Sequence, residues 1–306
     1  MTETLLPLRF TCVWEGDSAG VAPEAFLSAV VRVTGLSTSA SPTRSLSGSL
    51  HRLSLYVPAA PPTTREQRAA WIRAMEPDLG SEGLAVAITT GEMAQHGPAL
   101  VVLDGDSTLF TGEGIDLVAA HAGTQMEVAA ITAAAMRGEL DFAQSLRRRM
   151  GTLRGLPASV LDQVRQDYHF SPGAAQMVSD FHHRGVKVGV VSGGFRELVA
   201  PHATEIGLDF VKANSFEVAN GQLTGNPEGD IVTAETKETC LRSWAAKLGA
   251  SLESCVAMGD GANDLKMVRA AGLGVAYLAK PALQAAADVR LSWPNLAVLS
   301  ALTLPD

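Results

Sequence analysis

The chain has 306 residues, of which 46% are hydrophobic and 18% are charged, and its formal net charge at pH 7 is -8. This composition is typical of a globular protein and excludes a disordered chain, and the length predicts about two domains. The negative charge argues against a nucleic acid or an anionic membrane as partner, so a small-molecule partner is favoured.

We expect a soluble, cytoplasmic protein. The three cysteines, Cys12, Cys240 and Cys255, are too far apart for a CxxC pair or a zinc-finger spacing, which indicates a reducing compartment. The first residues lack a basic stretch followed by a long apolar segment. No apolar run reaches the roughly 20 residues that a membrane-spanning helix needs.

The first third of the chain alternates between strand-like and helix-like patterns. Apolar residues in alternation or in short runs predict strands, and apolar residues three or four positions apart predict helices. The expected strands lie at 8–14, 50–57 and 84–90, with one more in the Ser-rich stretch 36–48, and the expected helices lie at 22–33 and 64–75. This βαββαβ order predicts a small antiparallel sheet with two helices on one face.

The polar segment 90–99, interrupted by Gly and Pro, marks a domain boundary and gives expected domains at 1–95 and 96–306. Beyond it, short apolar runs are separated by helix-like stretches, as buried parallel strands are. The runs occupy 99–103, 186–192, 254–260 and 273–278. Strands that alternate with helices predict a doubly wound parallel sheet, whose ligands bind beyond the carboxyl ends of the strands.

Residues 113 to about 170 show no strand pattern, and their helical periodicity ends repeatedly at Gly. We therefore expect a helical insertion after the first strand of the sheet, lying over the ligand site. Further along the chain, Asn220-Gly221 between two strand-like stretches predicts a β-hairpin.

Acidic residues follow two strands of the predicted sheet. Asp104 and Asp106 come directly after the first strand, where two like charges raise one pKa unless a cation neutralises them. Asp260, Asn263 and Asp264 follow a later strand and offer further oxygen ligands. Because clusters of oxygen donors suit Mg²⁺, the sequence predicts a magnesium site at this edge.

Three other residues offer contacts to an oxyanion. Ser192 and Gly193 end another strand and supply a hydroxyl group and closely approachable backbone N–H groups. Lys237 adds a point charge that is able to reach the same edge. A carboxylate nucleophile, a metal ion, backbone donors and a lysine are together what phosphoryl transfer needs.

These motifs, taken in order, resemble the haloacid dehalogenase (HAD) superfamily and, within it, the phosphoserine phosphatase family. The stretches "VVLDGDSTLF", "VVSGGF" and "GDGANDLKM", together with Lys237, match the four superfamily motifs. The stretches "GEGIDLVAAHAG" and "AAMRGELDFAQSLRRR" match the narrower family. The resemblance runs from about residue 99 to the end and implies an α/β fold: a HAD-like, Rossmann-type doubly wound parallel sheet with a helical cap at about 113–170.

Two positions depart from the family pattern. Gly105 stands between the two aspartates, where a larger apolar residue is more usual, and we expect some added backbone freedom at the nucleophile. Thr236 stands before Lys237, where the family often has Gly.

The resemblance implies a role for each motif. Asp104 attacks phosphorus to form an aspartyl-phosphate, and Asp106 protonates the leaving hydroxyl and then deprotonates the attacking water. The implied Mg²⁺ ligands are the Asp104 side chain, the Asp106 backbone carbonyl and Asp260, with Asp264 tightening the cluster. The implied substrate contacts are Ser192, Gly193 and Lys237 on the phosphoryl group, and Asn263, which also tightens the metal cluster.

Substrate choice is expected from the cap. Glu113 matches the family residue that meets the substrate ammonium group, and Arg149 matches the residue that clamps its carboxylate, with either of the two preceding arginines as an alternative. Met136 and Phe142 match apolar residues that help to close the pocket. The implied reaction is Mg²⁺-dependent hydrolysis of O-phospho-L-serine, the last step of L-serine biosynthesis.

Two other functions stay open. One is a HAD phosphatase for another small ester, such as phosphothreonine or phosphohomoserine. The other is a catalytically silent amino-acid sensor, although a silent protein has no need to keep both aspartates.

The βαββαβ order of the first third resembles the ACT domain, a ferredoxin-like α+β module that senses amino acids. The stretch "WEGDSAGVAPEAF" matches its Asp-x-x-Gly turn through Asp17 and Gly20, with Ala19 in place of the usual Pro. Two interpretations stay open: this domain binds L-serine or another amino acid as an effector, or it only dimerises or stabilises the enzyme. Because ACT modules usually pair edge to edge, we expect a homodimer.

Overall fold

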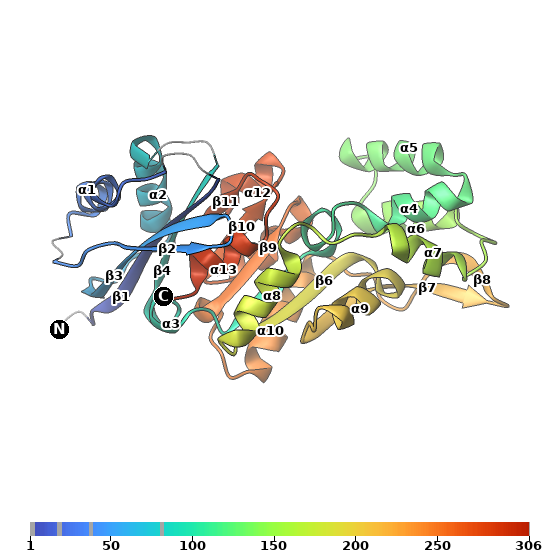
Figure 1. Cartoon of the computed structure of the whole chain (residues 1–306). Helices are drawn as coiled ribbons and strands as arrows, with labels where there is room; N and C mark the ends of the chain where they lie inside the picture. The colour runs from blue at the N-terminus through green and yellow to red at the C-terminus, as the bar shows by residue number, and fades with distance from the viewer. Residues whose placement is uncertain (1–3, 17–19, 37–38, 80–82, 306) are drawn as a thin grey trace.

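The computed structural model describes residues 4–16, 20–36, 39–79 and 83–305. The chain forms an N-terminal unit, a central α/β unit and a group of helices, which follow one another along an elongated molecule (Figure 1). Asp17 and Ala19 of the expected ACT-like turn lie outside the described residues. Within the described ranges, no helix combines the length and the apolar character that crossing a bilayer requires.

The N-terminal unit is an antiparallel sheet of order β2-β3-β1-β4, with α1 and α2 packed on one face. The expected βαββαβ order is observed, and the strand expected in the Ser-rich stretch is β2. The elements are β1 (Leu6–Glu15), α1 (Pro23–Thr34), β2 (Thr43–Ser47), β3 (Leu50–Ala60), α2 (Arg65–Leu79) and β4 (Leu84–Thr90).

The second face of this sheet is also covered. β1 is buried on both faces, because the face away from α1 and α2 packs against the C-terminal helix α13 (Ala297–Thr303). Arg52 on β3 donates a hydrogen bond to the Leu304 carbonyl oxygen at 2.6 Å. Arg65 at the start of α2 donates two hydrogen bonds to Asp288, at 2.5 and 2.6 Å. The N-terminal unit is therefore attached to the central unit at several points.

The segment 90–99 contains a short helix, α3 (Gly91–His96), that the sequence did not predict. Met93 and Ala94 are buried against β1 and β4, whereas the polar residues of this helix are exposed. A single apolar pair is too short a pattern to indicate a helix.

The central sheet has the order β11-β10-β9-β5-β6-β7-β8, and every pair is parallel except β7 with β8. The four predicted strands and the hairpin are confirmed, and Asn220 and Gly221 have the positive φ values of 51° and 76° that a tight hairpin needs. β11 was not predicted, because three residues are too few for a pattern. The strands are β5 (Leu100–Leu103), β6 (Lys187–Phe195), β7 (Phe210–Ala219), β8 (Gln222–Glu228), β9 (Cys255–Gly259), β10 (Leu273–Tyr277) and β11 (Val289–Leu291).

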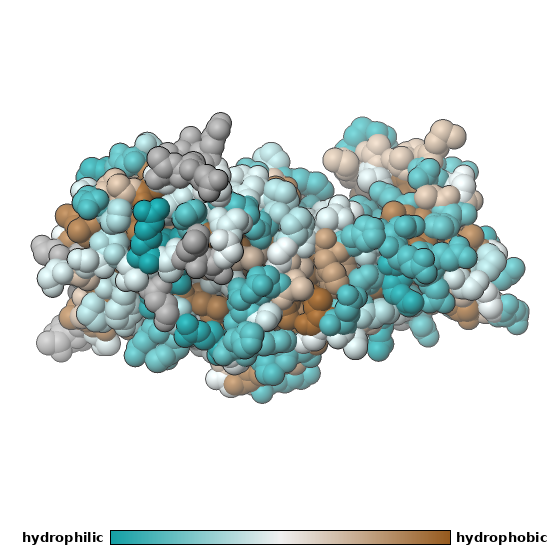
Figure 2. Space-filling model, viewed as in Figure 1, coloured by the Kyte–Doolittle hydropathy of each residue, from teal (hydrophilic) through white to brown (hydrophobic). Residues whose placement is uncertain are grey.

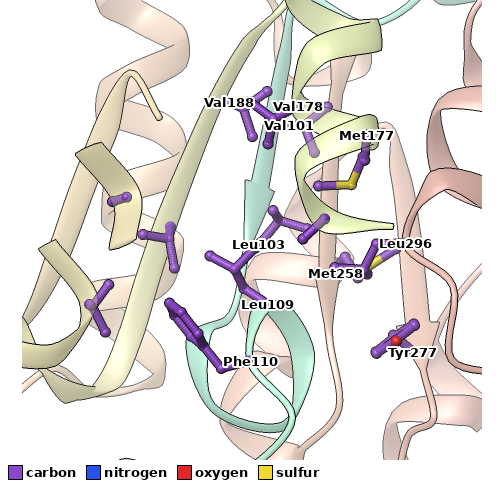
Figure 3. Packing of buried hydrophobic residues seen from close by; sticks show 14 of the residues in the cluster. Val101, Leu103, Leu109, Phe110, Met177, Val178, Val188, Met258, Tyr277 and Leu296 are labelled. Carbon is purple, nitrogen blue, oxygen red and sulfur yellow. The ribbon is translucent and has the colours of Figure 1, made fainter. Parts of the chain in front are cut away.

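Helices cover both faces of this sheet, and β5 lies at its centre. Val101 and Leu103 point toward α8 (Ala174–His183) and α9 (Arg196–Glu205), and Figure 3 shows them among Met177 and Val178 of α8. The alternate residues of β5 pack on the other face. That face carries α10 (Ala234–Lys247), α11 (Leu265–Ala270) and α12 (Pro281–Ala286).

The expected helical insertion is observed between β5 and α8. Its helices are α4 (Gly114–Ala122), α5 (Gln125–Met136), α6 (Phe142–Gly151) and α7 (Val160–Asp167). The two linkers that join it to the central unit pair through the bridge Phe110–Phe170 and a hydrogen bond from Thr111 N to His169 O of 3.0 Å. Figure 2 shows pale-brown side chains along the top of this cap, over α5.

Candidate active site

The predicted catalytic residues meet at one edge of the central sheet. β5 pairs in parallel with both β6 and β9, so the carboxyl ends of the three strands lie side by side. Asp104 directly follows β5, Ser192 lies in the last half of β6, and Asp260 directly follows β9. Residues far apart in the sequence are thus brought into one site, as the strand-end motifs predicted.

Lys237, in the first turn of α10, bridges two of these aspartates. Its Nζ lies 2.5 Å from Asp104 Oδ1 and 2.7 Å from Asp264 Oδ1, and the lysine side chain is 1% exposed. Burial by itself lowers the lysine pKa, but the attraction of Asp104 and Asp264 outweighs it and raises that pKa above its usual value. Lys237 is therefore charged at neutral pH. Thr236, which departs from the family pattern, takes part in a capping box with Thr233.

Asp104, Asp260 and Asp264 form a carboxylate cluster, with one oxygen from each lying within 4.8 Å of the others. Burial first, and then the charge of Asp264, raise the pKa of Asp104 well above its usual value and the pKa of Asp260 to about 6. A hard divalent cation prefers oxygen ligands and would relieve this repulsion, so the donor set fits a metal ion. Asn263 is half-buried in the same loop.

The Asp106 side chain points elsewhere. Its Oδ1 accepts hydrogen bonds from Gly114 N and from the Tyr168 hydroxyl, both at 2.8 Å. Burial first, and then the charge of Glu113, raise the pKa of Asp106 to about 7. Sequence reasoning missed Tyr168, because a tyrosine at the end of a helical insertion carries no motif. Burial, together with the Asp106 charge, raises the pKa of Tyr168 well above its usual value, so its hydroxyl stays protonated.

The loop at the end of β6 packs tightly against the loop after β5. A Cβ atom on Gly105 would lie 2.4 Å from Ser192 Oγ and 2.6 Å from Ser192 Cβ, so this close packing requires a residue without a side chain. The departure at Gly105 thus has a packing reason, whereas the sequence suggested backbone freedom. Ser192 is fully buried. Asn214 on β7, also missed in the sequence, donates to the Gly193 carbonyl oxygen at 2.7 Å and so fixes this loop.

The cap residues take up different environments. Arg149 is half-buried, and within the described part of the chain its buried Nε has no hydrogen-bond partner, whereas the two arginines before it are exposed. Glu113 accepts a hydrogen bond from the Ser107 hydroxyl at 3.1 Å. The Phe142 ring lies 3.0 Å from the position of a Cβ on Gly193. Met136 is 76% exposed, so it is not packed against the central unit.

Comparison with known proteins agrees with this geometry. Residues 101–269 match the family of haloacid dehalogenase-like hydrolases. The phosphoserine phosphatase of Streptococcus thermophilus is 50% identical over 197 residues, which cover 64% of this chain and 92% of that protein. The phosphoserine phosphatase SerB2 of Mycobacterium tuberculosis is 50% identical over 215 residues, which cover 70% of this chain and 53% of that protein. The chain therefore spans about half the length of the second relative.

One solved structure resembles the chain over nearly its whole length. It is a HAD-family hydrolase from Salmonella enterica serovar Typhi, with a TM-score of 0.79 and 27% identity, and the match covers 97% of this chain and 98% of that one. The similarity thus includes the N-terminal unit. With the strand-end aspartates and the buried lysine in place, the chain belongs to the haloacid dehalogenase-like hydrolases and, within them, to the phosphoserine phosphatase family.

Proposed function

We propose that the chain is a Mg²⁺-dependent phosphatase that hydrolyses O-phospho-L-serine to L-serine and inorganic phosphate. The observation that carries the reaction type is the group formed at one sheet edge by buried Asp104, Asp264 and Lys237 with half-buried Asp260. The relatives named phosphoserine phosphatases support the substrate. A cytoplasmic location and the last step of L-serine biosynthesis belong to the same proposal, and the free cysteines fit a reducing compartment.

The reaction proceeds in two displacements. A carboxylate oxygen of Asp104 attacks phosphorus, the bond from phosphorus to the serine oxygen breaks, and Asp106 gives its proton to that oxygen. A water molecule then gives a proton to Asp106 and attacks phosphorus, which releases phosphate and restores the Asp104 carboxylate. Because the pKa of Asp106 is about 7, this residue is able both to donate and to accept a proton near neutral pH.

The remaining residues of the site neutralise or position charge. Lys237, the Ser192 hydroxyl and the Gly193 backbone N–H face the phosphoryl group in this proposal. When bound, Mg²⁺ supplies positive charge that offsets the carboxylates and the phosphoryl oxygens. The proposed Mg²⁺ ligands are Asp104, Asp260 and the Asp106 backbone carbonyl, with Asn263 and Asp264 around them.

Arg149 and Glu113 are the proposed determinants of the amino-acid part of the substrate. A buried guanidinium nitrogen without a partner is costly, and a substrate carboxylate would supply the missing acceptor. The two preceding arginines are exposed, which favours Arg149 over them. Glu113 then meets the substrate ammonium group, and Met136 and Phe142 close the pocket when the ligand is bound.

We also propose that the N-terminal unit is an ACT-like regulatory or dimerisation domain. Its βαββαβ order and its sheet order β2-β3-β1-β4 support this interpretation. Strand β2 is an outer strand of this sheet in the described part of the chain, and pairing of its outer edge with a second copy would give a homodimer. Light scattering measures the oligomeric state. Calorimetric titration of Arg149→Gln, whose active site lacks the proposed carboxylate contact, with L-serine separates an effector site from a purely structural domain.

The test of the proposed reaction is phosphate release from L-phosphoserine and from a panel of other small esters, with Mg²⁺ or with EDTA. We expect Mg²⁺-dependent turnover that is highest on L-phosphoserine and lost in Asp104→Asn. Higher turnover of another ester would support the proposed phosphatase reaction but would contradict the proposal that L-phosphoserine is the substrate. Binding of L-serine without turnover of any ester would establish the silent sensor instead.

A further inference from the structure

We propose that Tyr168 is a positioning residue for Asp106, and that its hydroxyl group directs the proton-transferring oxygen of Asp106 toward the leaving group. This inference rests on the proposed function, in which Asp106 is the general acid. It adds a residue that none of the catalytic motifs contains.

Among the described residues, the donors that hold the Asp106 carboxylate all bond to one of its oxygens. Oδ1 accepts from Gly114 N and from Tyr168 Oη, each at 2.8 Å. Gly114 begins the first cap helix and Tyr168 follows the last one, so one donor comes from each end of the cap. A carboxylate oxygen has two lone pairs, and two donors occupy both of them.

The second oxygen, Oδ2, faces the catalytic loops. A Cβ on Gly194 would lie 2.5 Å from Asp106 Oδ2 and 3.0 Å from Ser192 Oγ, so Oδ2 lies directly beside the loop that ends β6. Because both lone pairs of Oδ1 are occupied, the proton that Asp106 donates has its place on Oδ2. The hydrogen bond from Tyr168 thus decides which carboxyl oxygen carries the proton and where that oxygen points.

The tyrosine is itself held in place. Its ring is 1% exposed and stacks on Phe110 with the ring centroids 4.0 Å apart. The His202 ring lies nearly perpendicular to the tyrosine ring at a centroid distance of 5.8 Å, and it is fixed by a 2.9 Å contact between Nδ1 and the Leu198 carbonyl oxygen. A hydroxyl on a ring held from two sides loses little entropy when it donates, which suits a positioning role.

The test uses the fact that only a poor leaving group needs a proton. Serine leaves as an alkoxide unless it is protonated, whereas p-nitrophenolate is stable without a proton. In Tyr168→Phe, which keeps the ring, we expect the single-turnover rate of enzyme phosphorylation to fall about ten-fold with L-phosphoserine and to change less than about two-fold with p-nitrophenyl phosphate. Tyr277→Phe is the matched control, since it removes a buried hydroxyl group that donates to neither Asp104 nor Asp106.

The ratio of the two rates is measured on one preparation, so it does not depend on how much of the variant is folded. An equal loss with both substrates, or no loss with either, would overturn the positioning role. The wild-type rate separates the two proposals. If the wild type does not hydrolyse L-phosphoserine, the proposed function fails, and the ratio is then taken with whichever alkyl phosphate the enzyme does hydrolyse.

Discussion

Lys237 and Asp104 form a buried ion pair with 2.5 Å between Nζ and Oδ1. The same ammonium group also contacts Asp264, so one lysine serves two buried carboxylates. Asp104 Oδ1 accepts from Gly105 N as well, at 2.6 Å. The proposed nucleophile is therefore anchored through one oxygen before any substrate arrives.

Removing the Lys237 charge should cost both activity and stability. In Lys237→Gln the two carboxylates lose their buried counter-charge, so we expect turnover to fall at least about 100-fold and the free energy of unfolding to fall by about 3 kcal/mol. Urea unfolding and phosphate release measure these effects. Lys266→Gln, which removes an exposed lysine near the same site, should change neither quantity appreciably. If Lys237→Gln is as stable and as active as the wild type, the ion pair contributes neither to stability nor to catalysis.

The contribution of Asp106 to the stability of the metal-free protein should fall as the pH rises. The pKa of Asp106 is about 7 in the folded chain and about 3.9 in an unfolded one, so the folded chain binds this proton more tightly. The resulting stabilisation is complete below about pH 4 and is lost as the pH rises toward 7. Its size is on the order of a few kcal/mol. In EDTA, the free energy of unfolding of the wild type, relative to that of Asp106→Asn, should therefore fall as the pH rises between these values.

Mg²⁺ should raise the melting temperature, because it binds the folded cluster and not the unfolded chain. In Asp260→Asn the site loses one carboxylate, and we expect the apparent affinity for Mg²⁺ to fall at least about ten-fold. Glu253→Gln removes an exposed carboxylate at the opposite end of β9 and is the control. If the melting curves of both variants respond to Mg²⁺ as the wild type does, Asp260 is not a ligand.

Arg149 should act on substrate binding and not on the chemistry. We expect Arg149→Gln to raise KM for L-phosphoserine about 100-fold, since a bidentate contact to the carboxylate is lost, and to leave the hydrolysis of p-nitrophenyl phosphate almost unchanged. Arg148→Gln, at an exposed neighbour, is the matched control. A rise in KM for L-phosphoserine in Arg148→Gln and not in Arg149→Gln would assign the carboxylate contact to Arg148.

The sequence predicted the position of the site because doubly wound topology fixes where strands end. That rule alone was enough to predict that Asp104, Ser192 and Asp260 lie close together. How deeply Lys237 is buried depends on how α10 packs, which no local pattern encodes. Tyr168 was missed for a related reason, since its partner Asp106 precedes it by 62 residues and the whole cap lies between them in the sequence.

The cap residues were harder to place from sequence. Motif matching gives the identity of a residue but not the position of the helix that carries it. Met136 lies at the end of α5, where 76% of the side chain is exposed, so a role in closing the pocket requires a movement or a ligand. That role stays a prediction.

The position of α13 has a consequence for dissecting this protein. The apolar cluster that contains residues of α13 and β5 also includes four residues of the N-terminal sheet, which are Val13, Leu50, Ala85 and Ala87. A fragment that starts at residue 96 would leave that cluster open to water along one side. The N-terminal unit has an apolar cluster of its own, but a second cluster crosses the boundary that the sequence suggests, and we expect the two halves to melt together in a single calorimetric transition.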